Sequence, residues 1–458
     1  MPSVWLAVRG LALSLALSAA VLGDELLTFE AGKLTDQFEA LPNSNVVRWT
    51  PESNVDSSRP RPSGRAIRLS GPAGGGLVTK EAFLGNTDWR QVQSIGLWLH
   101  RTADEAREHP SVELDIRLIE QDRQAYFWRR LEVAHVDWQQ VVLPLDWFVW
   151  SQDRIPRWDR VRFLGFRLRD PGSVTIDTVW TEPAKQARDD FLDATDISRV
   201  AFPPPARDNH SDSAATEPLR SRTLETRDVQ LLTNAPALEL ERLAAHLKLA
   251  ASLVRTELPF LAEPNRGPVL IVFQSADEYR QCIPRMARRF NLRIDPPDSD
   301  GYTLAGISVS SWSDKFGSVR PVYVHEFLHG YLSRAARLSP RGDWLQEGLA
   351  THFQLRLHPQ DDLPKVIATG LSSADRQLPL NELCDGRRIP TNRYWQAATL
   401  CQMLLSEPKY RRQLPKFFER LATANSSDLG PHLQPVWETN WDQLTTDWRK
   451  HCDAIVSR

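Results

Sequence analysis

The sequence is short of cysteine, of long apolar segments and of net charge, and each shortage excludes a class of protein. Its four cysteines form no Cys-x-x-Cys pair, which excludes a zinc site of that spacing. After residue 23, no apolar run approaches the about 20 residues that a membrane-spanning helix requires. The formal net charge is −2 over 458 residues, and the arginines are scattered, so we expect no nucleic-acid partner.

Residues 1–23 have the composition of a secretory signal peptide. Arg9 supplies the positive start, and an apolar run follows from Leu11 to Leu22. Cleavage is acceptable after either Ala20 or Gly23. Because the run is too short to span a bilayer, the sequence predicts a cleaved signal without a later transmembrane segment. The protein is therefore expected to be exported, either secreted or periplasmic.

The cysteines allow two interpretations in an exported protein. An even number permits disulfides, and four cysteines allow three pairings among Cys282, Cys384, Cys401 and Cys452. Cys401 lies in a strongly apolar stretch, so a buried free thiol fits it equally well.

Residues 24–184 predict an antiparallel β-sandwich of the jelly-roll type. Short apolar or alternating runs recur through this range and are separated by turn residues. Nine of the 16 tryptophans lie between Trp49 and Trp180, a pattern typical of a sandwich. The last two runs, Phe163–Leu168 and Val174–Val179, resemble the final strands of carbohydrate-binding or galactose-binding-like modules. That resemblance implies a glycan or cell-surface ligand.

The tryptophans of this domain have two interpretations. They can stack on sugar rings, or they can fill the core, where aromatic burial is large. The second interpretation is the default for a sandwich. The tryptophans concerned are Trp128, Trp147, Trp150 and Trp158.

Residues 185–226 predict a linker, because Pro203–Pro205 and the polar run after them can bury little surface. Residues 227–458 predict a second domain of the α+β class. Tyr302–Trp312 alternates and is expected to be one strand, while the chain after Pro321 predicts helices. The chain is thus predicted to be multidomain, with a mainly helical C-terminal part.

Soon after Pro321 the chain contains the pattern H-E-x-x-H, formed by His325, Glu326 and His329. Residues four apart lie on one face of a helix, so the two imidazoles point to one place, as in helical zinc sites. Glu326 lies beside the first ligand, where it can take a proton from a metal-bound water. Pro321 fits the first turn of this helix, and Ser318 is expected to cap it.

A second helix is predicted over Trp344–Leu357, with Asp343 as its N-cap. Glu347 falls in its first turn, where the helix dipole favours a carboxylate. The apolar surroundings of Glu347 indicate burial, and a buried carboxylate needs a partner, so Glu347 is the predicted third ligand. His352 and His358 are not expected to reach the metal, because one lies on the opposite face and the other at the helix end.

Two histidines on one helix and a glutamate on the next resemble the arrangement of the gluzincin metallopeptidases. The pattern H-E-F-x-H followed by W-L-x-E-G-x-A is similar to peptidase MA-like domains. A weaker resemblance extends from about Arg227 to the C-terminus. It implies an α+β metallopeptidase domain, and its motifs are specific for the metal site but not for a substrate.

The resemblance also implies a role for each site residue. Zn²⁺ would be bound by His325, His329 and Glu347, and Glu326 would be the general base toward a peptide or protein substrate. Tyr394 lies 47 residues after Glu347 and resembles the downstream tyrosine of the family, which would stabilise the oxyanion. Ordinary packing of an aromatic ring at a helix start is the alternative for Tyr394.

Two further expectations come from the plan of the family. The strand before the metal helix, here Leu304–Ser310, would lie at the sheet edge and pair with an extended substrate. Some members have an acid four residues after the glutamate ligand, where it orients a ligand histidine. This chain has Thr351 there, which can orient a histidine only weakly.

Two other functions stay open on the sequence. One is a non-catalytic protein that binds a glycan or a cell surface on a retained peptidase scaffold, although the intact Glu326 argues against it. The other is a zinc hydrolase that acts on a different type of bond. The leading hypothesis is an exported zinc metallopeptidase with an N-terminal β-sandwich accessory domain.

Overall fold

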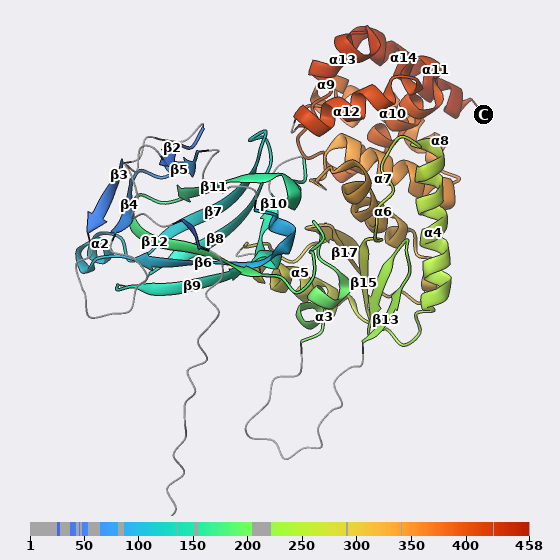
Figure 1. Ribbon diagram of the computed structural model, residues 1–458. Helices are drawn as coiled ribbons and strands as arrows, with labels where there is room; N and C mark the ends of the chain where they lie inside the picture. Colours follow the sequence, from blue (N-terminus) through green and yellow to red (C-terminus); the bar gives the residue numbers. More distant parts are fainter. Residues whose placement is uncertain are drawn as a thin grey trace, which may run out of the picture.

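Antiparallel sheets make up the N-terminal part of the computed structural model, and helices dominate its C-terminal part (Figure 1). The predicted signal peptide, residues 1–23, lies outside the described residues. The structure describes residues 25–27, 37–42, 45, 48–53, 65–80, 87–134, 136–150, 154–203, 221–289, 292–339, 341–424 and 426–457.

Two six-stranded antiparallel sheets form the N-terminal domain. The first has the order β3-β4-β12-β6-β9 with β1 beside β12, and the second has the order β10-β8-β7-β11-β5-β2. Apolar side chains of both sheets, such as Ile176 of the first and Phe166 of the second, share one core, which confirms the predicted antiparallel β-sheet domain. Helix α2 (Ala103–Glu108) lies between β6 and β7. The strands are β1 (Glu25–Leu27), β2 (Phe38–Ala40), β3 (Arg48–Ser53), β4 (Arg65–Gly71), β5 (Gly76–Thr79), β6 (Val92–His100), β7 (Val112–Glu120), β8 (Tyr126–Val133), β9 (Gln139–Pro144), β10 (Val149–Trp150), β11 (Val161–Leu168) and β12 (Gly172–Pro183).

Trp128, Trp147, Trp150 and Trp158, the possible sugar platforms of the sandwich, lie against other parts of the protein. Trp158 is buried and stacks on a phenylalanine ring with 3.6 Å between centroids, and Trp128 is buried too. The Trp147 ring lies 5.3 Å from a guanidinium group. Trp150 donates from Nε1 to Ser339 Oγ of the second domain at 3.2 Å. Their roles in this structure are therefore packing and contact between domains.

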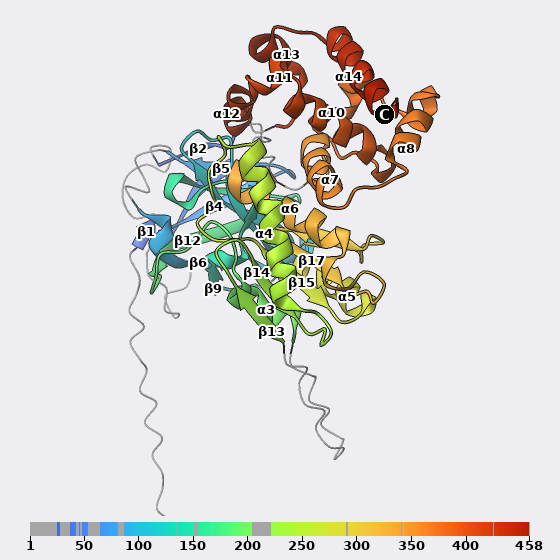
Figure 2. The same cartoon turned by 90° about the vertical axis from the view of Figure 1, so that its right-hand side faces the viewer.

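A five-stranded mixed sheet of order β13-β14-β15-β17-β16 is the base of the second domain. Helices α3 (Ala194–Ala201) and α5 (Ala276–Arg289) cover one face, and α4 (Leu240–Glu257) and α6 (Pro321–Ala336) cover the other (Figure 2). Both α3 and β13 fall within residues 185–226, so part of the predicted linker belongs to this domain. The strands are β13 (Arg222–Glu225), β14 (Gln230–Thr233), β15 (Val269–Phe273), β16 (Gly301–Leu304) and β17 (Ile307–Ser311).

The segment predicted as one strand, Tyr302–Trp312, is a hairpin. Ala305 and Gly306 turn the chain with φ values of 52° and 75°, as two-residue hairpin loops require. As a result β17 lies inside the sheet between β15 and β16, and β16 forms the edge. The prediction that Leu304–Ser310 is the edge strand is therefore wrong.

Helices make up the chain after β17, which confirms the predicted helical C-terminal part. They share one apolar core with α4 and α6. No helix in the described part of the chain has both the length and the apolar character needed to cross a membrane. The remaining helices are α7 (Trp344–Leu357), α8 (Leu363–Leu371), α9 (Leu380–Leu383), α10 (Tyr394–Ser406), α11 (Pro408–Arg411), α12 (Leu414–Ala424), α13 (Gly430–Trp437) and α14 (Trp441–Val456).

All four cysteines are buried free thiols, so none of the three disulfide pairings that the sequence allows is formed. Cys282 lies in α5, Cys401 in α10 and Cys452 in α14, and Cys384 follows α9. For Cys401 the free-thiol interpretation is the one that the structure adopts.

The two domains meet at the connection between α6 and α7. The backbone N–H of Ile155, in the sandwich, donates to the carbonyl of Arg337 at 2.7 Å. The Arg337 guanidinium pairs with Asp190, which follows β12, at 2.8 Å. Together with the bond from Trp150 to Ser339, these contacts anchor the loop between α6 and α7 to the sandwich.

Candidate metal centre

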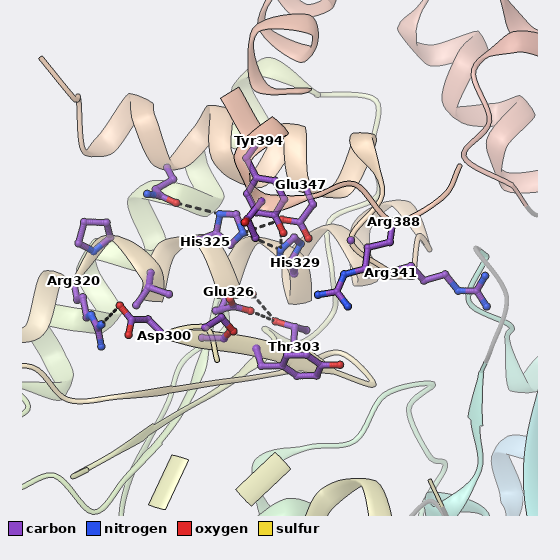
Figure 3. Close-up of a pocket in the computed structure, with 18 of the residues that line it drawn as sticks. Asp300, Thr303, Arg320, His325, Glu326, His329, Arg341, Glu347, Arg388 and Tyr394 are labelled. Carbon is purple, nitrogen blue, oxygen red and sulfur yellow. Dashed lines mark hydrogen bonds and ion pairs between the residues drawn. The ribbon is translucent and has the colours of Figure 1, made fainter. Parts of the chain in front are cut away.

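His325, His329 and Glu347 direct their donor atoms to one place between α6 and α7 (Figure 3). The two Nε2 atoms lie 3.1 Å apart. Oε2 of Glu347 is 3.1 Å from Nε2 of His325 and 3.4 Å from Nε2 of His329. All three donor atoms lie within 4.8 Å of one another, so the structure brings the predicted ligand set together.

Helix α6 fixes the two histidines one turn apart. Pro321 occupies its first turn, where the missing N–H leaves no hydrogen bond unmade, and Arg320 is the N-cap. Ser318 does not cap this helix, contrary to the sequence prediction. Its Oγ instead accepts from the backbone N–H of Glu239 at 2.9 Å, which ties the start of α6 to α4.

Helix α7 places Glu347 by its N-terminal cap. The Asp343 side chain accepts hydrogen bonds from the backbone N–H groups of Leu345 and Gln346, at 2.9 and 3.1 Å. Glu347 therefore lies in the first turn, as predicted, and the helix spans the predicted range Trp344–Leu357.

Two glutamines of α7 contact the outer nitrogens of the histidines. Nδ1 of His325 lies 3.1 Å from Oε1 of Gln354, and Nδ1 of His329 lies 3.4 Å from Oε1 of Gln346. An amide oxygen is an acceptor, so it favours the tautomer with the proton on Nδ1 and a free lone pair on Nε2. Thr351, at the position where some gluzincins have an orienting acid, has a buried hydroxyl without a hydrogen-bond partner among the described residues.

Glu326 lies beside the histidines on the face of α6 that is turned toward the β16–β17 hairpin. Thr303 Oγ1 donates to its Oε2 at 2.7 Å, and Ser308 Oγ donates to its backbone carbonyl at 2.7 Å. A Cβ on Gly301 would lie 2.5 Å from Cγ of Glu326, so only glycine lets the strand approach this closely. Burial raises the pKa of Glu326 above its usual value, although the nearby histidines and Thr303 oppose the shift.

Tyr394 is the first residue of α10 and lines the same cavity as the proposed ligands. Its ring is nearly parallel to that of His325, with 6.0 Å between centroids. Burial and the carboxylate of Glu347 raise the pKa of Tyr394, so its phenol stays protonated at neutral pH. Helix α10 is held close to α7 because Gly348 faces it, and a Cβ there would lie 2.6 Å from Cys401 Sγ.

Without a metal, Glu347 and His329 form a buried charged pair. Burial opposes charge on both groups, but each stabilises the charge of the other. The positive charge of His329 and the hydrogen bonds from both histidines hold the pKa of Glu347 well below its usual range. The carboxylate of Glu347 raises the pKa of His329 to about 9.

The remaining histidines of α7 face away from this site, as predicted. Nε2 of His352 lies 3.2 Å from a carboxylate oxygen of Glu257 on α4. Nε2 of His358 lies 2.8 Å from Nε2 of His246, also on α4.

The donor atoms open into a cavity of about 950 Å³. The edge strand β16 and the start of α6 line one side, and the segment that leads into α10 lines the other. The cavity contains the predicted residues His325, Glu326, His329, Glu347 and Tyr394. Sequence reasoning did not identify Thr303 as a partner of Glu326, because the hairpin that presents it was predicted as one strand.

No protein-family model matches the chain, and no curated protein matches it. Among solved structures, it is similar to the family 11 carbohydrate-binding module of a Clostridium thermocellum cellulase, with 14% identity, a TM-score of 0.27, and coverage of 36% of this chain and 97% of that one. It is also similar to the CBM22-1 xylan-binding domain of Paenibacillus barcinonensis Xyn10C, with 14% identity, a TM-score of 0.24, and coverage of 36% and 99%. These likenesses extend over about a third of the chain and, with scores this low, say nothing about its function. None of these comparisons supports the resemblance to gluzincins, which therefore depends on the sequence of this chain alone.

Proposed function

We propose that this chain is an exported zinc-dependent metallopeptidase. One observation carries the proposal: two imidazole nitrogens and a carboxylate oxygen lie within 4.8 Å of one another, beside the buried Glu326. The cavity of about 950 Å³ next to them is large enough for several residues of a peptide.

The donor set fits zinc. Two histidine nitrogens and one glutamate oxygen are a ligand set of catalytic zinc sites, which keep a fourth position for water or substrate. The glutamines behind His325 and His329 favour the tautomer that presents Nε2 to a metal. Bound zinc supplies a water of lowered pKa and polarises a substrate carbonyl.

Glu326 is the proposed general base. Its carboxylate receives the proton of the attacking water and passes it to the leaving amine, so the same group acts as base and then as acid. Burial raises its pKa, which brings it closer to the neutral pH at which it must gain and lose a proton. The hydrogen bond from Thr303 fixes the orientation of one carboxylate oxygen.

Tyr394 is the proposed donor to the oxyanion. Its phenol is kept protonated by burial and by Glu347, so it can donate a hydrogen bond to the oxygen that becomes negative during attack. The stacking on His325 limits where the ring can move.

The edge strand β16 supports a peptide as substrate. It is the outermost strand beside β17, and its residues Gly301, Tyr302 and Thr303 line the cavity. The free side of an edge strand can pair with an extended chain through backbone hydrogen bonds. We therefore propose that the substrate pairs with β16, and not with Leu304–Ser310 as the sequence predicts.

The experiment combines metal analysis with an unbiased peptide library, using the full exported chain, Glu326→Gln, and the exposed control Glu241→Gln on α4. We expect one zinc per chain in all three proteins. Cleavage should fall by about 10²–10⁴-fold in Glu326→Gln and stay at the wild-type level in the control. Zinc binding without cleavage that depends on Glu326 would disprove the peptidase proposal. Absence of zinc binding would disprove both the peptidase and the alternative zinc hydrolase that acts on another type of bond.

A further inference from the structure

One wall of the catalytic cavity carries arginines. Arg341 lies on the connection between α6 and α7, and Arg387 and Arg388 lie between α9 and α10. In Figure 3 the side chain of Arg388 extends toward His329, with Arg341 beyond it. On the opposite wall, Arg320 pairs with Asp300 at 2.5 Å.

Arg388 lies near the proposed metal ligand Glu347. A Cβ on Gly342 would lie 3.5 Å from Nε of Arg388 and 3.5 Å from Oε1 of Glu347, so both atoms flank the same glycine. The charge of Arg388 also acts on the Tyr394 hydroxyl. The guanidinium is thus beside the reacting groups and not merely at the cavity mouth.

Among the residues that the structure describes, none matches the charge of Arg388. Among the described residues, no carboxylate lies within ion-pair distance of its guanidinium, whereas Arg387 has Asp385 at 3.4 Å. Glu347 is turned toward the histidines, and Asp300 toward Arg320. An exposed guanidinium at the wall of a cavity is suited to bidentate binding of a carboxylate.

A second cavity continues the positive surface. It has a volume of about 610 Å³ and shares Thr391 with the catalytic cavity. Its charged lining consists of Lys365, Arg376 and Arg393 against Asp362. The positive wall therefore follows the segment before α10 out of the catalytic cavity, which fits an extended acidic chain.

We propose that this wall selects polypeptide segments with Asp or Glu close to the bond that is cut, and that Arg388 binds the acidic side chain. The inference rests on the proposed peptidase function. Arg388 acts here as a specificity-determining residue, and the cations of the second cavity bind further acidic residues of the same chain.

The cleavage experiment compares peptides that differ only by Glu and Gln, or Asp and Asn, near the cleaved bond. Wild type should prefer the acidic member, and Arg388→Gln should lower the ratio of the two kcat/KM values by about 10- to 100-fold, the range for a hydrogen bond to a charged group. Arg388→Glu should reverse the preference toward Lys. The control Arg412→Gln, at an exposed position after α11, should leave the ratio unchanged.

The binding experiment makes the inference independent of turnover. The same peptides, with a fluorescent label, are titrated onto full-length zinc-loaded Glu326→Gln, with and without Arg388→Gln. We expect tighter binding of the acidic peptide, lost with Arg388→Gln and weakened by salt. Equal binding of acidic and amide peptides would overturn the inference. Cleavage without a preference for acidic peptides would also overturn the proposed role of Arg388, but it would leave the peptidase proposal intact. Selective binding of acidic peptides without cleavage that depends on Glu326 would refute only the peptidase proposal.

Discussion

Nδ1 of His325 lies 3.1 Å from the amide oxygen of Gln354, two turns after Glu347 on the same helix. One helix thus supplies both a proposed metal ligand and the residue that would orient a proposed ligand of the other helix. Because the amide oxygen can only accept, it fixes the proton on Nδ1 and leaves Nε2 for the metal.

Replacement of Gln354 should weaken zinc binding without unfolding the domain. Gln354→Ala removes the acceptor that orients His325, and loss of such partners typically lowers metal affinity 10- to 100-fold. Gln354→Glu keeps an acceptor and should bind zinc at least as tightly as wild type. Competition with a chromophoric chelator measures both, with the exposed Gln413→Ala as control. Unchanged affinity of Gln354→Ala would show that Gln354 does not orient the ligand.

Replacement of Thr303 should affect the proposed base. Thr303 Oγ1 donates to Glu326 at 2.7 Å, and this bond lowers the pKa of Glu326 against the larger effect of burial. Thr303→Val removes the bond, so the pKa rises further and the acid limb of the kcat/KM profile shifts to higher pH. We expect kcat to fall about 3- to 10-fold with little change in KM, and Thr303→Ser to restore both. A Val variant with the wild-type pH profile would contradict this role.

The sequence predicts the ligands better than their surroundings for a physical reason. The spacing of His325 and His329 and the cap at Asp343 are local, so helical geometry alone places these donor atoms. The contacts of Thr303 depend on a hairpin whose turn, Ala305-Gly306, looks like the interior of a strand in the sequence. The sequence also predicts the wrong edge strand, because the turn at Ala305-Gly306 is not recognised. The order of strands in a sheet depends on tertiary contacts that no local pattern shows.

The domain contact could not be predicted at all. Trp150 and Ile155 look like sandwich residues in the sequence, and nothing local shows that they contact Ser339 and Arg337. Glycan stacking and core packing were the two interpretations considered for Trp150, and the structure gives it a third role at the domain boundary.

The metal-free protein should lose stability as the pH rises toward about 9. Burial lowers the pKa of His329, but Glu347 outweighs this and raises it to about 9, compared with about 6.5 in an unfolded chain. A raised folded-state pKa gives stability that is complete below the unfolded value and is lost as the pH passes the folded value.

Urea denaturation of the chelated protein measures this loss between about pH 6.5 and 9. The free energy of unfolding should fall across this window in wild type and change less in His329→Gln. Parallel curves for the two proteins would contradict the charged pair between His329 and Glu347.

The contact with the sandwich should influence zinc affinity through the loop between α6 and α7. Arg337 pairs with Asp190, which follows β12 of the sandwich. The carbonyl of the next residue, Leu338, accepts a hydrogen bond from Nε2 of Gln346 at 2.8 Å. The amide oxygen of the same Gln346 faces His329. Arg337 has a φ of 59°, which glycine adopts without strain, so Arg337→Gly removes only side-chain contacts. We expect lower stability by about 1–3 kcal/mol and a loss of zinc affinity smaller than about tenfold. In a Gln346→Ala background the same change should have no further effect on zinc affinity, because the connection to His329 is already broken. Additive losses of affinity in the double variant would show that the sandwich acts on the metal site by another route.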